Sequence, residues 1–153
     1  LVETIQGNER LFGAEDVSDA RRAVEVSLGE LDRTFGDVYG NDAGHLEFQS
    51  TARASYALNK AFGAPIGKAF GITVGAPAGI GVVLADTAVK AATVDVIGYA
   101  SPAGGTSFSN EVISFLSGDS GAVRQAIIAA REVGIPLLGA LGATPESTTT
   151  PYI

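Results

Sequence analysis

The spacing of apolar side chains predicts an amphipathic helix over residues 16–35. Charged residues occupy one side of this segment, and small or apolar residues recur every three or four positions on the other, at Ala20, Ala23, Val24, Leu28 and Leu31. Asp16 or Ser18 is suited to cap its first turn, because both side chains accept hydrogen bonds from free backbone N–H groups. The pattern ends near Gly36.

Beyond residue 36 the pattern changes to short strands that alternate with helices. Apolar alternation or apolar runs predict strands over residues 45–49, 66–74, 94–99 and 111–116. Helical spacing predicts helices over residues 51–62, 77–92 and 119–133. The remaining segments are expected to be a polar connector over 37–44, a Ser/Gly/Pro/Thr loop over 101–110, a strand-like apolar run over 136–141 and an irregular tail over 143–153.

Composition and charge exclude several classes of partner. The chain has 153 residues, 46% of them hydrophobic, so it is expected to fold around a core. Its net charge is −7, which disfavours binding to a nucleic-acid backbone. Its apolar runs are all interrupted well short of the roughly 20 residues of a membrane span. We therefore expect neither nucleic acid nor membrane as a partner. No Met stands at position 1, which indicates a processed chain or a fragment.

Side chains that carry out catalysis are scarce. The chain has no Cys and a single His, His45, so neither a thiolate nucleophile nor a metal site with several His or Cys ligands is expected. No Gly-x-Ser-x-Gly motif is present, and a surface role for His45 is favoured over a catalytic one. The expectation is no enzyme activity, no metal and no cofactor. The 20 glycines favour a structural or binding role.

Residues 75–81, with the sequence Gly-Ala-Pro-Ala-Gly-Ile-Gly, are the most tempting ligand site. They follow a predicted strand and open a predicted helix, as a nucleotide-binding loop does. However, Leu84 stands where the third glycine of that motif belongs, and no Gly-Lys-Ser/Thr follows. Close packing of helix on sheet is the favoured interpretation. An α/β nucleotide-binding or small-ligand-binding domain that uses this loop remains the alternative.

A weak internal repeat indicates how the chain is organised. The positions Asp16, Arg21 and Ala23 match Asp119, Arg124 and Ala126, and both sets open a predicted helix. This spacing is the size of a domain. It predicts that residues 1–44 are the final strand and helix of an earlier copy, and that residues 45–153 form one complete domain.

Two motifs in a fixed order carry a family resemblance. The first is Asp-Thr-Ala-Val-Lys-Ala-Ala-Thr-Val over residues 86–94, and the second is Gly-Asp-Ser-Gly-Ala-Val-Arg-Gln-Ala over residues 118–126. With the loop over 101–110 between them, they resemble the bacterial microcompartment (BMC) shell domain. Further segments are similar to its tandem-domain, trimer-forming branch in propanediol-utilisation compartments and to an ethanol-utilisation relative: residues 31–45, 51–55, 61–65, 105–111 and 151–153.

The resemblance implies a fold, an assembly and two functional regions. The fold would be α/β (α+β): a circularly permuted BMC domain with a mainly antiparallel, four-stranded sheet and helices packed on one side. The chain would form a homotrimer that mimics a hexamer, in a shell located in the cytoplasm, beside other BMC shell proteins and encapsulated enzymes. Lys90 would lie at the tile edge. A pore for small polar metabolites, such as 1,2-propanediol or glycerol, would be lined by Ser101, Pro102, Ala103, Gly104, Gly105, Thr106, Ser107, Phe108 and Ser109.

Overall fold

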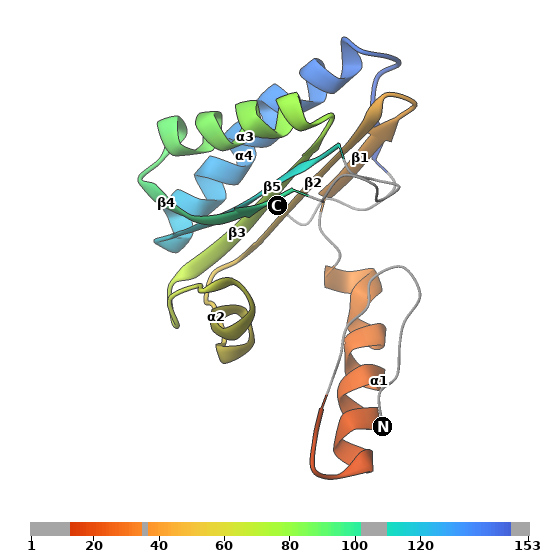
Figure 1. The fold of residues 1–153 in the computed structure, drawn as a ribbon, viewed down its shortest axis with the longest axis vertical. Coiled ribbons are helices and arrows are strands. Elements are labelled where there is room, and N and C mark those ends of the chain that lie inside the picture. Colours follow the sequence, from red (N-terminus) through yellow and green to blue (C-terminus); the bar gives the residue numbers. More distant parts are fainter. Residues whose placement is uncertain (1–12, 35–36, 102–109, 148–153) are drawn as a thin grey trace. The chain divides into compact units, whose positions relative to one another are not determined.

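The computed structural model describes residues 13–34, 37–101 and 110–147 of the chain. Its contacts divide the chain into two compact units, Leu1–Phe35 and Gly36–Ile153 (Figure 1). Each unit is described by itself below. Eight of the nine predicted pore residues, 102–109, lie outside the described residues.

The first unit contains one long helix, α1 (Val17–Thr34), which confirms the helix predicted over residues 16–35. Asp16 precedes it, and its Oδ1 atom accepts hydrogen bonds from the Ser18 hydroxyl at 2.6 Å and the Ser18 backbone N–H at 2.7 Å. These two hydrogen bonds, the hydroxyl's first, lower the pKa of the Asp16 carboxyl. Within this unit Leu28 keeps 46% of its surface exposed, so the apolar face of α1 is only partly covered.

The second unit is built on a sheet whose neighbouring strands all pair antiparallel. Its strands lie in the order β4-β5-β3-β2-β1-β6. This confirms the mainly antiparallel sheet, with six strands in place of the expected four. The strands are β1 (Asp37–Asn41), β2 (Gly44–Thr51), β3 (Ala69–Ala76), β4 (Val94–Ala100), β5 (Val112–Gly118) and β6 (Glu146–Ser147).

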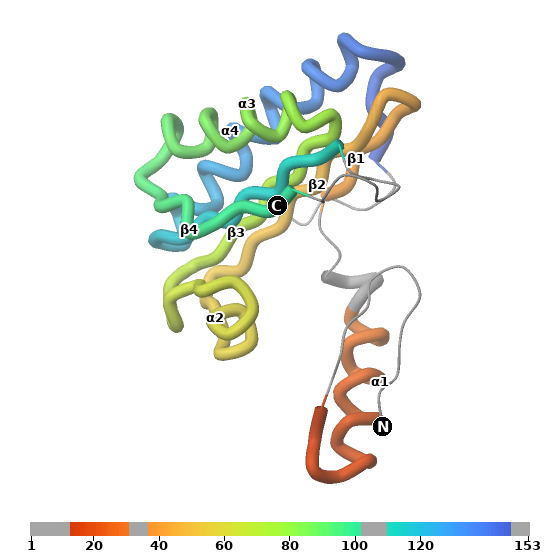
Figure 2. Tube along the Cα trace, in the orientation of Figure 1, coloured from red at the N-terminus to blue at the C-terminus, as the bar shows by residue number. Residues whose placement is uncertain are grey.

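Two helices pack on one face of this sheet and a third packs on the other. Helices α3 (Ala78–Ala91) and α4 (Ser120–Gly139) lie side by side over the strands (Figures 1 and 2). The core beneath them is formed by buried apolar side chains that include Leu46, Phe48, Leu84, Leu116, Ile127 and Leu138. The short helix α2 (Tyr56–Phe62) covers the opposite face, where it packs near Phe70 and Phe115. Helices therefore lie on both faces rather than on the expected one.

The prediction of a polar connector over residues 37–44 is wrong. Residues 37–41 form strand β1, which pairs with β2 from Asp37 opposite Phe48 to Asn41 opposite Gly44. The polar sequence misled because the Asp37 carboxylate is fully buried and forms an ion pair with Arg131, 94 residues away. A charge paired in this way is compatible with a sheet interior.

The prediction of a strand over residues 136–141 is also wrong, because helix α4 continues through Pro136 to Gly139. Buried positions in this helix recur every four residues, at Ala130, Gly134 and Leu138, which is the spacing of one helical face. A Cβ atom on Gly134 would lie 2.8 Å from Leu84 Cδ2, so the glycine permits α4 to approach α3 closely. At the tail, residues 146 and 147 form the short strand β6.

Candidate functional site at the loop between β4 and β5

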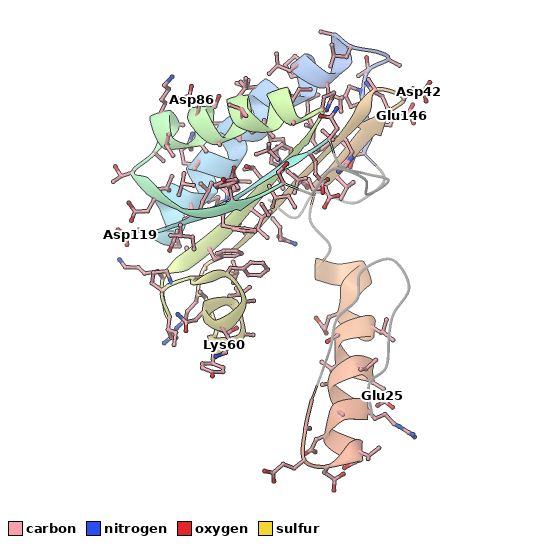
Figure 3. All side chains as sticks on the ribbon, in the orientation of Figure 1. Glu25, Asp42, Lys60, Asp86, Asp119 and Glu146 are labelled. Atoms are coloured by element: carbon pink, nitrogen blue, oxygen red, sulfur yellow. The ribbon has the colours of Figure 1, made fainter. Side chains whose placement is uncertain are left out.

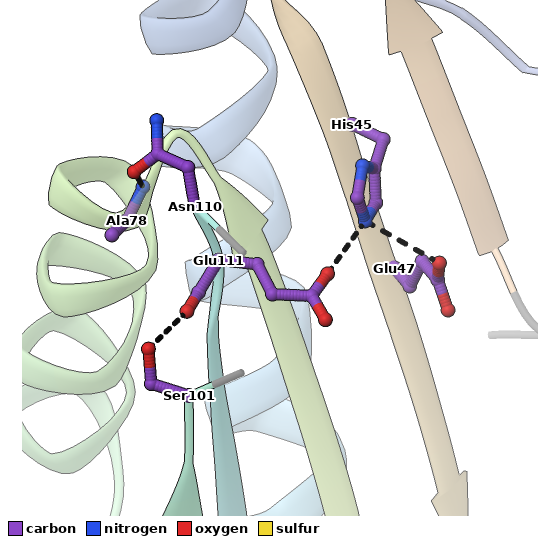
Figure 4. Close-up of polar contacts among 6 residues, drawn as sticks. All are labelled: His45, Glu47, Ala78, Ser101, Asn110 and Glu111. Atoms are coloured by element: carbon purple, nitrogen blue, oxygen red, sulfur yellow. Dashed lines mark hydrogen bonds and ion pairs between the residues drawn. The ribbon is translucent and has the colours of Figure 1, made fainter. Parts of the chain in front are cut away.

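The two ends of the loop between β4 and β5 are tied together. These strands pair antiparallel up to Ala100 opposite Ile113, which brings the residues that follow and precede them to one end of the sheet. There the Ser101 hydroxyl donates a hydrogen bond of 2.8 Å to the backbone carbonyl of Glu111 (Figure 4). Ser101, the one described member of the predicted pore residues, thus closes the base of the loop.

Asn110 ties the same loop base to helix α3. Its Oδ1 atom accepts a hydrogen bond of 3.2 Å from the backbone N–H of Ala78, the first residue of α3 (Figure 4). The residue at the N-cap position of α3 is Pro77, and it makes no side-chain capping bond. A side chain 32 positions away along the chain therefore caps this helix.

A row of polar side chains runs from the loop base to strand β2. The carboxylate of Glu111 lies 3.1 Å from His45 Nε2, and the carboxylate of Glu47 lies 3.6 Å from the same nitrogen (Figure 4). The His45 side chain is 32% exposed and that of Glu111 is 16% exposed, so water screens the contact only in part. His45 therefore supports the loop base rather than a hydrolytic site.

The glycines of residues 75–81 are used for close packing. A Cβ atom on Gly75 would lie 2.4 Å from the backbone nitrogen of Gly81, so strand β3 and helix α3 touch through their backbones. A Cβ atom on Gly81 would lie 2.7 Å from the Val112 side chain of β5. Together with the Asn110 cap, this geometry supports the packing interpretation and leaves the nucleotide-binding alternative without support.

Lys90 lies on the exposed side of α3, in its last turn. Its ammonium group is 2.5 Å from the Asp86 carboxylate, and both side chains are more than half exposed, at 72% and 55%. An exposed pair at this spacing stabilises a helix by only about 0.3–0.5 kcal/mol. The same side of α3 exposes Val82 and Val89, at 59% and 40%. The pair alone gives little reason for a lysine at this position.

The structure places the two predicted functional regions at opposite ends of one helix. Ala78, which Asn110 caps, begins α3, and Lys90 lies twelve residues later. A rise of about 1.5 Å per residue separates them by roughly 18 Å. Sequence reasoning identified the loop and the lysine but not Asn110, Glu111 or His45 as anchors of the loop, because their partners are distant in sequence.

Neither a metal site nor a membrane helix is found in the described parts of the chain. Within residues 13–34, 37–101 and 110–147, no group of three or more His, Asp or Glu side chains could hold a metal ion. None of the helices there combines the length and the apolar character needed to cross a bilayer.

The antiparallel sheet, the glycine-packed helix α3 and the two ordered motifs define the class of this protein. The BMC domain family model matches residues 69–143. The crystal structure of EtuB from Clostridium kluyveri is 48% identical, with a TM-score of 0.85, and the match covers 100% of this chain and 71% of that one. The chain belongs to the BMC domain family.

The individual relatives are shell proteins. The bacterial microcompartment shell protein PduB of Citrobacter freundii is 63% identical over 147 residues, which are 96% of this chain and 54% of the relative. PduB of Limosilactobacillus reuteri is 52% identical over 143 residues, covering 94% and 60%. A crystal structure of a trimeric shell protein PduB is 53% identical, with a TM-score of 0.83, covering 92% and 62%. The chain thus spans little more than half the length of these relatives.

Proposed function

We propose that this chain is part of a structural shell protein of a bacterial microcompartment and acts as a tile rather than as an enzyme. It forms a homotrimer that mimics a hexamer and joins other BMC shell proteins in a facet of a shell in the cytoplasm. The observation that carries this proposal is the likeness to the trimeric PduB structure, which extends over 92% of the chain. Identity of 53% over such a length supports a shared assembly as well as a shared fold.

Within that protein, residues 1–44 correspond to the end of one BMC domain and residues 45–153 to a second, permuted one. The proposal is supported by the repeat between the starts of α1 and α4, where Asp16 and Asp119 each precede the helix. In this division strand β1 comes from the first region and pairs into the sheet of the second. The exposed apolar face of α1 would then pack on a sheet of the preceding domain.

The loop from Ser101 to Ser109 lines the pore of the tile. Hydroxyl groups and backbone amides can replace the water contacts of a small polar solute one for one, which suits 1,2-propanediol or glycerol. The bonds of Ser101 and Asn110 at its base support this role, because they hold both ends of the loop on the sheet and on α3. A crystal or electron-microscopy structure of the assembly tests this directly: the loop must lie at a symmetry axis, and a loop remote from every axis refutes the assignment.

Lys90 contacts a neighbouring tile at the edge. Its long apolar stem can pack on the exposed valines of α3 while its ammonium group reaches carbonyl oxygens of the neighbour. We expect Lys90→Ala to leave the melting temperature within about 2 °C of the parent, since an exposed pair contributes little. The flat sheets that the parent forms at high concentration should be lost in electron micrographs.

The matched control for Lys90 is Lys60→Ala, which removes an exposed lysine on the opposite side of the sheet. The control should form sheets as the parent does. Sheets of unchanged extent in Lys90→Ala would show that the lysine pairs only with Asp86 in its own helix.

A further inference from the structure

Helix α2 and its flanks carry an unusual local charge. No Asp or Glu occurs from residue 48 to residue 85, although the whole chain carries a net charge of −7. The same stretch contains three cations, Arg53, Lys60 and Lys68. All three are exposed on or beside α2. In Figure 3 the labelled Lys60 lies on the side of α2 that points away from the strands.

Two of these cations have no carboxylate partner among the described residues. The Lys68 ammonium lies 2.9 Å from Asp119, so its charge is already paired. Arg53 and Lys60 form no such pair within the part of the chain that the structure describes. A positive potential is therefore left uncompensated at both ends of α2.

Large apolar side chains are exposed beside these cations. Tyr56 keeps 69% of its surface exposed and Ile66 keeps 64%. Tyr56 and Lys60 are four residues apart and therefore share one side of the helix. We name Arg53, Tyr56, Lys60 and Ile66 together the α2 patch. Tyrosine and arginine beside an aliphatic side chain are typical of protein interfaces rather than of ordinary solvated surface.

The α2 patch rests on a rigid support. Beneath it the ring of Phe62 stacks 5.5 Å from that of Phe70 and lies 4.9 Å from that of Phe115. The two flanks are joined by backbone hydrogen bonds, from Ala54 N–H to the Lys68 carbonyl at 2.6 Å and from Gly67 N–H to the Ala54 carbonyl at 3.1 Å. A surface that is already ordered loses little entropy when a partner binds.

We propose that the α2 patch docks an acidic peptide segment of another protein, one that carries at least one large apolar side chain. Charge complementarity carries the choice of partner. Carboxylates of the segment pair with Arg53 and Lys60, and its apolar side chain covers Tyr56 and Ile66. A nucleic acid or an anionic membrane fits less well, because both extend beyond two cations and meet a chain of net charge −7. The inference goes beyond the proposed tile function and does not depend on it.

The test uses the full chain and a fluorescent probe peptide of twelve residues, built from Glu with Leu at every third or fourth position. Fluorescence anisotropy at low ionic strength should give saturable binding that weakens when salt is raised, because the Debye length falls. Arg53→Glu combined with Lys60→Glu should weaken binding at least tenfold. The matched control Arg124→Glu, which reverses an exposed cation on α4, should bind as the parent does.

Three further results decide the proposal. Tyr56→Ala should weaken binding without changing its salt dependence, because it removes apolar contact rather than charge. Sheet formation should be unchanged in all four substitutions, which separates a failure of docking from a failure of the tile function. Binding that survives Arg53→Glu with Lys60→Glu overturns the proposal. Tighter binding of a single-stranded oligonucleotide, or of vesicles containing anionic lipid, overturns it as well.

Discussion

Replacing Arg131 by alanine should destabilise the second unit more than any exposed charge substitution. Arg131 of α4 forms an ion pair with Asp37 of β1, and Asp37 is fully buried. The substitution removes this countercharge and leaves the carboxylate in a poorly hydrated place. Loss of one partner of a buried pair typically costs about 3–5 kcal/mol. The Arg131 side chain keeps 19% of its exposure, so water can reach the site and the lower figure, about 3 kcal/mol, applies.

Thermal unfolding followed by circular dichroism measures this loss. A change of about 3 kcal/mol corresponds to a fall of roughly 6–12 °C in melting temperature for a chain of this size. Arg124→Ala, which removes an exposed arginine from the same helix, should change the melting temperature by less than about 2 °C. The double substitution Asp37→Leu with Arg131→Leu should recover much of the loss, because no unpaired charge remains. A melting temperature of Arg131→Ala within 2 °C of the parent, about the size of a surface effect, would refute this reasoning.

Three further substitutions follow from single contacts. Thr73→Val should raise the free energy of unfolding by about 1 kcal/mol in urea titrations, because Thr73 Oγ1 is buried with no hydrogen-bond partner among the described residues; a loss would contradict this. Gly75→Ala should cost at least about 1 kcal/mol through its contact with α3, whereas Gly79→Ala, with open space around its Cβ, should gain about 0.5 kcal/mol; equal effects would contradict the close approach. The hydrogen bond and charge of Lys68 hold the pKa of the Asp119 carboxyl below its usual range and raise the pKa of Lys68. The stability lost in Lys68→Ala should therefore be largest near neutral pH and should vanish as the pH falls through the pKa of Asp119 or rises through that of Lys68; a loss independent of pH would contradict it.

The sequence predicted the elements whose residues agree locally with the final fold. Helix α1 and the body of α4 have apolar side chains at helical spacing, and β4 and β5 have runs typical of strands. The two ordered motifs carried the family, because the spacing between the helices that hold them is set by the fold. These parts of the fold depend on patterns within short windows.

The parts that were missed depend on contacts between distant residues. Strand β1 is polar because Asp37 meets Arg131, and no local pattern shows that contact. Pro136 indicated the end of a helix, yet the burial of Leu138 against the sheet keeps α4 helical beyond it. Asn110 and Glu111 read as ends of a loop, and their roles at α3 and at His45 follow only from the folded chain.

The mass of the purified protein in solution tests the central claim most directly. A tile that mimics a hexamer requires three copies to associate, so light scattering should give three times the chain mass of 15.5 kDa at micromolar concentration. The mass should remain constant on dilution through the range in which a stable interface holds. A monomer throughout that range would contradict the account.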